Sequence, residues 1–270
     1  MQLSNCLTNT DDAMLCVLDY VVGVTQLRDV VYIACQWSST VRRYNAITQQ
    51  QLTDLSIKDM RDPSDIASCE QTSCVYVVDS KCIWRVSADG SDIKRWLSKP
   101  QSETLTPWKL SVTSSRVLVT SDDTRQLIQF DEGGKEMRRV RLPNYMEPRH
   151  AVESPTGTFI VSIRDTQKNQ QLVSEFNAEG QVLRYLSGLL PLDWTQHIAV
   201  DSRGYIFVAD RESRHILLLD TQLALRRIII DEHQLNHSYE KPQRLCYREL
   251  SGQLLVGFYR GSVTVFDVLR

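Results

Sequence analysis

One short apolar motif recurs along the chain at a nearly constant interval, and this repeat limits the fold more than any other feature. Each copy is a run of β-branched and aliphatic residues, such as Val30–Cys35 or Tyr205–Asp210. The central positions are separated by 44, 42, 42, 47 and 48 residues, and they are Ile33, Val77, Val119, Val161, Val208 and Val256. This period, with several short strands in each repeat, is typical of β-propeller blades rather than of ankyrin or leucine-rich repeats.

Two further landmarks keep the same register around each central position. A proline or its replacement opens a strand 12 to 14 residues earlier, at Pro63, Pro107, Pro148, Thr195 and Pro242. An apolar residue followed by Asp or Asn, which start turns, ends a later strand at Tyr44–Asn45, Phe130–Asp131, Phe176–Asn177, Leu219–Asp220 and Phe266–Asp267. The phasing predicts six four-stranded blades at roughly 20–57, 63–98, 107–142, 148–187, 195–230 and 242–268.

The last repeat ends at Arg270, directly after its third strand. We therefore expect its outer strand to come from residues 1–18, with Met14–Leu18 as the best match. This pairing would close the ring and cover an otherwise open sheet edge. The sequence as a whole predicts an all-β chain, with residues 1–270 forming one six-bladed β-propeller closed by an N-terminal strand.

The fifth repeat carries a recognisable motif. Its first strand ends in Val200–Asp201, a turn follows at Gly204, the next strand ends in Ala209–Asp210, and Arg211 comes directly afterwards. This pattern resembles an NHL repeat, and the segment from Pro242 to Asp267 is similar. The resemblance implies an NHL propeller like the C-terminal domains of tripartite-motif ubiquitin ligases and Brat-type translational repressors. The position of Asp210 departs from that pattern in four other repeats, which carry Cys35, Ser121, Ile163 and Phe258.

The charge balance and the length of the apolar runs limit which compartment and which partners the sequence favours. The chain has 31 Lys and Arg against 33 Asp and Glu, so no global cationic field attracts it to nucleic acid or anionic lipid. The longest apolar runs, such as Ile216–Leu219, are far shorter than the about 20 residues of a membrane span, and the first residues do not resemble a secretory signal. The seven cysteines lack CxxC spacing and favour reduced, buried thiols. We expect a cytoplasmic protein without membrane contact that is monomeric as an isolated domain.

One face of a propeller carries the loops that lead into the innermost strands and the loops between second and third strands. We place a partner-binding surface there. Its residues near the axis are Lys109, Arg149, His150, His197 and Arg244, and those farther out are Arg125, Arg164, Lys168, Arg211, Arg214 and Arg260. The aromatic residues of the same loops are Trp37, Trp108, Trp194 and Tyr259. Arginine beside aromatic rings suits both protein hot spots and unstacked bases. The alternative is that the arginines pair with neighbouring acids and the tryptophans fill seams between blades.

The two candidate metal ligands are His150 and His197, which occupy equivalent positions and can both face the channel. Propeller lyases that cleave hydroxyglycine peptides bind zinc through three such histidines. The matching positions here are Lys109 and Arg244, cations that repel a metal, and only Asp65 offers the carboxylate that a lactonase-type calcium site requires. We therefore predict no metal and no cofactor.

The sequence contains no nucleophile elbow, phosphate loop or dinucleotide fingerprint, so we expect that the chain is not an enzyme. The leading hypothesis is a binding scaffold that recognises a protein or peptide with its loop-rich face. The NHL resemblance implies a place as the substrate-recognition part of a larger tripartite-motif-like ubiquitin ligase. The first alternative is sequence-selective binding of single-stranded RNA on the same face. The second, ranked lower, is a metal-dependent propeller lyase or hydrolase.

Overall fold

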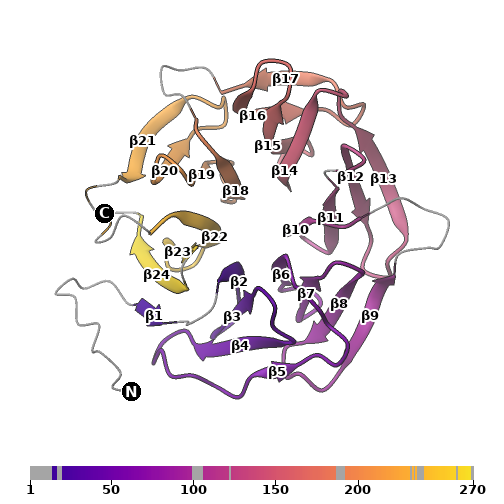
Figure 1. The fold of residues 1–270 in the computed structure, drawn as a ribbon, viewed down its shortest axis with the longest axis vertical. Helices are drawn as coiled ribbons and strands as arrows, with labels where there is room; N and C mark the ends of the chain where they lie inside the picture. Colours follow the sequence, from indigo (N-terminus) through magenta and orange to yellow (C-terminus); the bar gives the residue numbers. More distant parts are fainter. Residues whose placement is uncertain are drawn as a thin grey trace.

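The computed structural model describes residues 14–16, 20–98, 106–121, 123–186, 192–231, 233, 235, 240–259 and 261–268. These residues form six four-stranded antiparallel sheets and no helix. Figure 1 shows the sheets arranged as blades around a central axis, with the first strand of each blade innermost. The predicted all-β, six-bladed propeller is confirmed. In the described part of the chain, no helix has the length and apolar character needed to cross a bilayer.

The strands follow one another from the axis outward. Blade 1 contains β2 (Val21–Leu27), β3 (Val30–Cys35), β4 (Thr40–Asn45) and β5 (Leu55–Ser56), and blade 2 contains β6 (Asp65–Cys69), β7 (Cys74–Val78), β8 (Cys82–Ser87) and β9 (Ile93–Ser98). Blade 3 contains β10 (Lys109–Thr113), β11 (Arg116–Ser121), β12 (Gln126–Phe130) and β13 (Glu136–Arg141). Blade 4 contains β14 (Met146–Glu153), β15 (Phe159–Asp165), β16 (Gln170–Phe176) and β17 (Val182–Tyr185). Blade 5 contains β18 (Thr195–Val200), β19 (Ile206–Asp210), β20 (His215–Leu219) and β21 (Leu225–Ile230).

The sixth blade combines the two ends of the chain. It contains β22 (Pro242–Arg248), β23 (Gln253–Phe258), β24 (Ser262–Asp267) and, as its outer strand, β1 (Met14–Cys16). β1 pairs antiparallel with β24, with Met14 opposite Thr264 and Cys16 opposite Ser262. Figure 1 shows β1 beside β24 at the junction with blade 1. The predicted closure by an N-terminal strand is confirmed.

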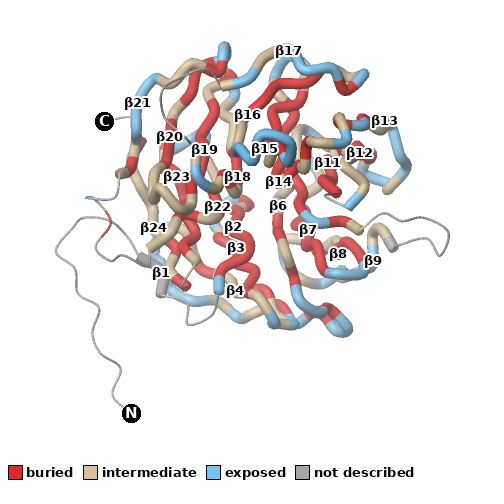
Figure 2. Tube along the Cα trace, turned by 45° about the horizontal axis from the view of Figure 1, so that its top comes forward, coloured by how far each residue is buried: buried red, intermediate tan, exposed pale blue. Residues whose placement is uncertain are grey.

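The core lies between neighbouring blades, because each sheet presents an apolar surface on both faces. Every residue of β7 and β19 is buried, and Figure 2 shows burial concentrated on the inner strands while the outermost strands are largely exposed. One cluster joins Tyr32 of blade 1 to Val77 and Trp84 of blade 2. Stacking of adjacent blades therefore covers apolar surface that no single blade could bury.

The beginnings of the inner strands are irregular in four blades. The pairing register shifts between Val21 and Gly23, Pro148 and His150, Thr195 and His197, and Pro242 and Arg244. Such bulges change the direction of side chains and occur next to functional sites. At the fourth blade, β14 begins at Met146, two residues before the predicted start at Pro148. A proline fits inside this strand because it lies at the bulge, where regular pairing is interrupted.

Candidate functional site

Each blade contributes one residue to the same level of the central channel. We call this set the axial layer, and it consists of Gly23, Asp65, Lys109, His150, His197 and Arg244. Their equivalence follows from the ladder, in which they pair with Ala34, Val78, Thr120, Ser162, Ala209 and Gly257 of the second strands. The side chains of this layer are buried. Equivalent backbone positions therefore bring together very different chemical groups at the axis.

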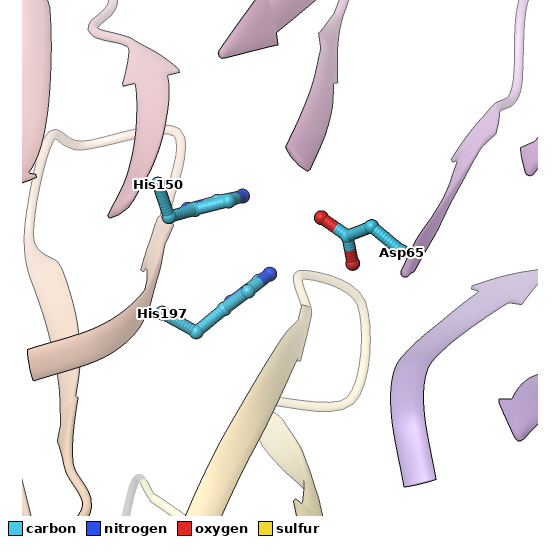
Figure 3. Close-up of side chains that lie close together, drawn as sticks. All are labelled: Asp65, His150 and His197. Atoms are coloured by element: carbon cyan, nitrogen blue, oxygen red, sulfur yellow. The ribbon is translucent and has the colours of Figure 1, made fainter. Parts of the chain in front are cut away.

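Asp65, His150 and His197 point toward one another across the channel, as Figure 3 shows. One ligand atom from each residue lies within 4.8 Å of the others. The two imidazole rings stack with their centroids 3.7 Å apart. The Asp65 carboxylate accepts hydrogen bonds from the backbone N–H groups of Ile66 (3.0 Å) and Leu110 (3.1 Å). This carboxylate is therefore held in place by two blades.

Backbone contacts determine the tautomer of both imidazoles. Nδ1 of His150 accepts a hydrogen bond from the N–H of Ile198 at 3.3 Å, and Nδ1 of His197 accepts one from the N–H of Leu245 at 3.4 Å. A neutral ring that accepts at Nδ1 carries its proton on Nε2. Burial lowers the pKa of His150 to about 4, against the opposing effect of Asp65. Burial, and then the neighbouring His150, also lower the pKa of His197 well below its usual value. Both rings are neutral hydrogen-bond donors at physiological pH.

This trio does not have the properties of a prepared metal centre. Ligation through Nε2 would move the ring proton to Nδ1, where it would face the N–H groups of Ile198 and Leu245. Arg244 has Nε 3.8 Å from an Asp65 oxygen, and its positive charge would repel a metal ion there. Asp65, His150 and His197 are therefore better suited to hydrogen bonding within the channel than to binding a metal ion.

The two cations of the axial layer bind backbone carbonyl groups. The Lys109 ammonium donates to the carbonyl oxygen of Ser64, and Nε of Arg244 donates to that of Val22. These contacts place both cations inside the channel. We expected Lys109, His150, His197 and Arg244 to belong to the partner-binding face, near the axis. Their burial corrects that placement, because a macromolecule on the face cannot reach them.

A cavity of about 590 Å³ continues along the channel from the axial layer, and His150 and His197 belong to its lining. Its other lining residues include Ser114, Pro155 and Ser202, from the turns between first and second strands. The cavity therefore opens toward the face opposite the loops that the sequence analysis singled out. Among the described residues, the lining contains several hydroxyl groups and the carboxylates of Glu153, Asp201 and Glu249, and no arginine or lysine.

The other predicted residues form a continuous contact chain over five blades. We call it the arginine–aromatic arc, and its members are Arg125, Glu147, Arg149, Arg164, Trp194, Arg211, Tyr259, Tyr20 and Trp37. Glu147 contacts the first three arginines, and the guanidinium of Arg149 lies over the Trp194 ring at 5.3 Å. The guanidinium of Arg211 lies over the Tyr259 ring at 4.5 Å.

The arc ends in a cluster of aromatic rings that joins blade 6 to blade 1. Tyr20 packs on Tyr259 with centroids 4.9 Å apart and on Trp37 with centroids 5.7 Å apart. Trp37 is 71% exposed and has a left-handed backbone conformation, with φ of 59°. A large exposed ring on a constrained turn is suited to contact with a partner.

The arc has a surplus of cations. Among the described residues, its arginines contact two carboxylates, those of Glu147 and Glu212, and Glu212 also pairs with Lys241. The arc itself therefore has four arginines against two contacting carboxylates. Sequence reasoning missed Tyr20, Glu147 and Lys241, although each directly precedes or follows the start of an inner strand, where the landmark prolines occur.

The remaining predicted residues lie near the arc or outside the description. Trp108 is exposed and has the Lys109 ammonium 5.2 Å from its ring, and Lys168 is exposed in the loop after β15. Arg214 donates to the carbonyl oxygen of Leu235 at 3.4 Å. Arg260 lies outside the described residues.

Comparison with known proteins supports the fold and not a family. No family model and no curated protein matches the sequence. A propeller in the crystal structure of a nidogen/laminin complex is 14% identical with a TM-score of 0.67, over 85% of each chain. A gluconolactonase from Xanthomonas campestris is 12% identical with a TM-score of 0.70, over 94% of this chain and 89% of the other. A catalytically inactive virginiamycin B lyase from Staphylococcus aureus, in a structure with quinupristin, is 10% identical with a TM-score of 0.66, over 91% of this chain and 79% of the other.

These comparisons define the chain as a six-bladed β-propeller, a fold that is compatible with a binding scaffold. They also correct the expectation that the chain is not an enzyme. A gluconolactonase and a lyase share its fold, so the missing nucleophile elbow and phosphate loop do not separate it from propeller enzymes. At these identities the likeness extends to the fold alone.

Proposed function

We propose that this chain is a recognition module whose arginine–aromatic arc binds an acidic segment of a partner protein. The observation that carries the proposal is the line of contacts from Arg125 to Trp37, in which cations outnumber carboxylates. The backbone N–H of Arg211 donates to the carbonyl oxygen of Trp194 at 3.0 Å and so joins the two halves of the line. Arginine and aromatic side chains dominate the binding energy of protein interfaces. The blades hold these loops on a rigid support, so little conformational entropy is lost on binding. A propeller of similar fold in a nidogen/laminin complex supports a protein partner.

The test is a selection of displayed random peptides on the immobilised protein, followed by affinity measurement for the enriched sequences. We expect enrichment of Asp and Glu. The Arg149→Glu, Arg211→Glu double variant should weaken binding at least about tenfold, because it reverses two charges of the arc. The matched control is Arg138→Glu with Arg141→Glu, which reverses two exposed charges on the outer strand β13. Peptides without acidic enrichment, or equal loss in both double variants, would contradict the proposal.

RNA remains the alternative ligand for the same face. A randomised RNA pool, selected at low and high salt, distinguishes the two because phosphate contacts make RNA affinity fall steeply with salt. Sequence enrichment in the RNA pool that depends on Arg149 and Arg211, together with no peptide enrichment, would replace the protein partner by RNA.

We extend the proposal to an NHL-type module that selects substrates within a larger cytoplasmic ubiquitin ligase. The NHL-like segment of residues 198–216 supports the module type. The buried free thiols of Cys69, Cys74 and Cys82 support a reducing compartment. Immunoblotting of native extract tests the larger context, because a native chain of only 31.0 kDa would contradict it.

A further inference from the structure

We infer that Arg125, Arg149 and Arg164 form a binding site for the phosphate group of a phosphorylated partner peptide. The inference rests on the proposed function, because it assigns a ligand group to one part of the arginine–aromatic arc. We call these three residues, together with Glu147, the arginine cluster.

The arginine cluster brings three guanidinium groups to one carboxylate. Nη2 of Arg125 lies 3.7 Å from Oε1 of Glu147, while Nη2 of Arg149 and Nη1 of Arg164 lie 3.9 Å from Oε2. These separations are ion-pair contacts that are too long for hydrogen bonds. A surface pair elsewhere behaves differently, since Nη2 of Arg139 lies 2.6 Å from Glu136. Glu147 therefore attracts three cations without engaging the directional hydrogen bonds of any of them.

The guanidinium groups of the cluster remain open to a ligand on the face. The side chains of Arg125, Arg149 and Arg164 are 34%, 19% and 39% exposed. The Nε atoms of Arg125 and Arg149 are buried without an acceptor among the described residues, as are those of several other arginines, so a ligand would be bound by the terminal Nη groups. The Trp194 ring beneath Arg149 restricts the plane of that guanidinium, which prepares it for a ligand.

The backbone of Arg125 follows a turn that recurs in the blades. Arg125 has φ of 52° and directly precedes β12, and the corresponding residues before β16, β20 and β24 are Asn169, Arg214 and Gly261, which also have positive φ. The left-handed turn therefore sets the position of Arg125 on this face, at some conformational cost for an arginine.

The charge of the arginine cluster favours phosphate over carboxylate. Three arginines and one glutamate leave two positive charges, and a phosphate monoester carries about −1.5 to −2 at neutral pH. A peptide carboxylate would neutralise only one of these charges. The phosphate also offers three terminal oxygens, each of which can accept from a guanidinium. A phosphoserine, phosphothreonine or phosphotyrosine side chain therefore matches the cluster in both charge and number of acceptors.

The rest of the arc favours a peptide over RNA. Beyond Trp194, Arg211 and Lys241 share Glu212, and the arc then continues as the uncharged rings of Tyr259, Tyr20 and Trp37. A nucleic acid backbone needs a row of cations along its length. The arc instead offers one concentrated anion site followed by an aromatic surface, which suits a singly phosphorylated segment with apolar residues beside the phosphate.

The experiment compares two random peptide pools that differ only in a fixed central residue, serine or phosphoserine, with phosphotyrosine as a second arm. We expect the phosphorylated pool to be retained at least about tenfold better, since hydrogen bonds between charged groups are roughly twice as strong as those between neutral groups. The Arg125→Gln, Arg164→Gln double variant should remove this preference, whereas the control Arg138→Gln, Arg141→Gln should keep it. The Glu147→Gln variant should bind the phosphorylated pool more tightly, because it removes a competing carboxylate. Phenyl phosphate should compete with the phosphorylated pool.

Thermal unfolding of each variant shows whether a loss of binding reflects a loss of fold. Equal retention of both pools by the wild-type protein would overturn the inference, and so would weaker binding by a folded Glu147→Gln variant. If acidic unphosphorylated peptides still bind and depend on Arg211, the proposed function survives that result. RNA retention that the Arg125→Gln, Arg164→Gln variant abolishes, without any preference for phosphopeptides, would overturn the peptide assignment.

Discussion

Acidification should destabilise the propeller well above the pH at which its carboxylates titrate, because two neutral histidines are buried in the axial layer. Burial lowers the pKa of His150 to about 4 from an ordinary 6.5, and Arg244 and Lys109 contribute in the same direction. The folded chain therefore binds this proton less tightly than the unfolded chain. Protonation favours unfolding, so the stabilising contribution is complete above about pH 6.5 and is lost as the pH falls toward 4.

The expected loss of unfolding free energy follows from the difference between the folded and unfolded pKa values of His150. A pKa of about 4 in place of 6.5 corresponds to about 3 kcal/mol at neutral pH, of which about 2 kcal/mol is lost by pH 4.5. The lowered pKa of His197 adds a loss of the same sign. The pH range used for the measurement should end near pH 4.5. Below it, carboxylates such as Glu136, whose pKa is lowered by a hydrogen bond from Arg139, begin to contribute to the loss of stability.

Urea unfolding followed by tryptophan fluorescence, at several values between about pH 7 and 4.5, measures this slope. The informative variant is His150→Asn, since an asparagine oxygen can still accept from the N–H of Ile198 while removing the titrating ring. It should lower the pH dependence even if it lowers stability at neutral pH. The control is His215→Asn in β20, the same exchange at a partly exposed position outside the axial layer. A flat wild-type profile, or equal slopes for wild type and His150→Asn, would refute the reasoning.

Three further changes test the architecture. Gly23→Ala should lower the free energy of unfolding by about 1–3 kcal/mol through overpacking, because its Cβ would lie 2.6 Å from the Ile66 side chain and 2.7 Å from the Ile66 nitrogen. The control Gly133→Ala should be nearly neutral in the same urea titration. Deletion of residues 1–18 removes the strand that pairs with β24 and should broaden and lower the thermal transition, so an unchanged transition would count against closure. Asp65→Leu should cost about 3–5 kcal/mol, because it leaves Arg244 buried without its carboxylate, and a loss below about 1 kcal/mol would show that the pair contributes little.

Periodicity was sufficient to predict the blades, because burial on both faces imposes the same strand pattern on each repeat. The spacing from Ile33 to Val256 fixed the blade number, and the missing last strand pointed to Met14–Leu18. The candidate face also followed from the register, since loop position within a blade determines the face of a propeller. The contacts that join Arg149 to Trp194 and Arg211 to Tyr259 agree with that placement.

The register alone could not predict which side chains lie on the loop-rich face and which are buried in the channel. Arg149 and His150 are adjacent, and the sequence placed both near the axis. The bulge between Pro148 and His150 separates them, so that the Arg149 side chain reaches Trp194 while His150 is 1% exposed in the channel. Pro148 is compatible with a bulge, but the residue types do not show which of the neighbouring side chains the bulge turns toward the face. Glu147 was missed for a related reason, since its three arginine partners come from separated segments that only the folded chain brings together.

The mixed chemistry of the axial layer has a structural explanation in the inner strands. Each inner strand pairs on one edge only, so its other edge presents backbone groups to the channel. Asp65 and the Nδ1 atoms of the two histidines accept from four N–H groups, those of Ile66, Leu110, Ile198 and Leu245. Lys109, Arg244 and Nε2 of His150 donate to carbonyl groups of Ser64, Val22 and Leu110. Acceptors and donors are thus both required at one level of the channel, because buried backbone groups of both kinds must be satisfied there. The same need explains why buried cations and a buried carboxylate are found side by side in this layer.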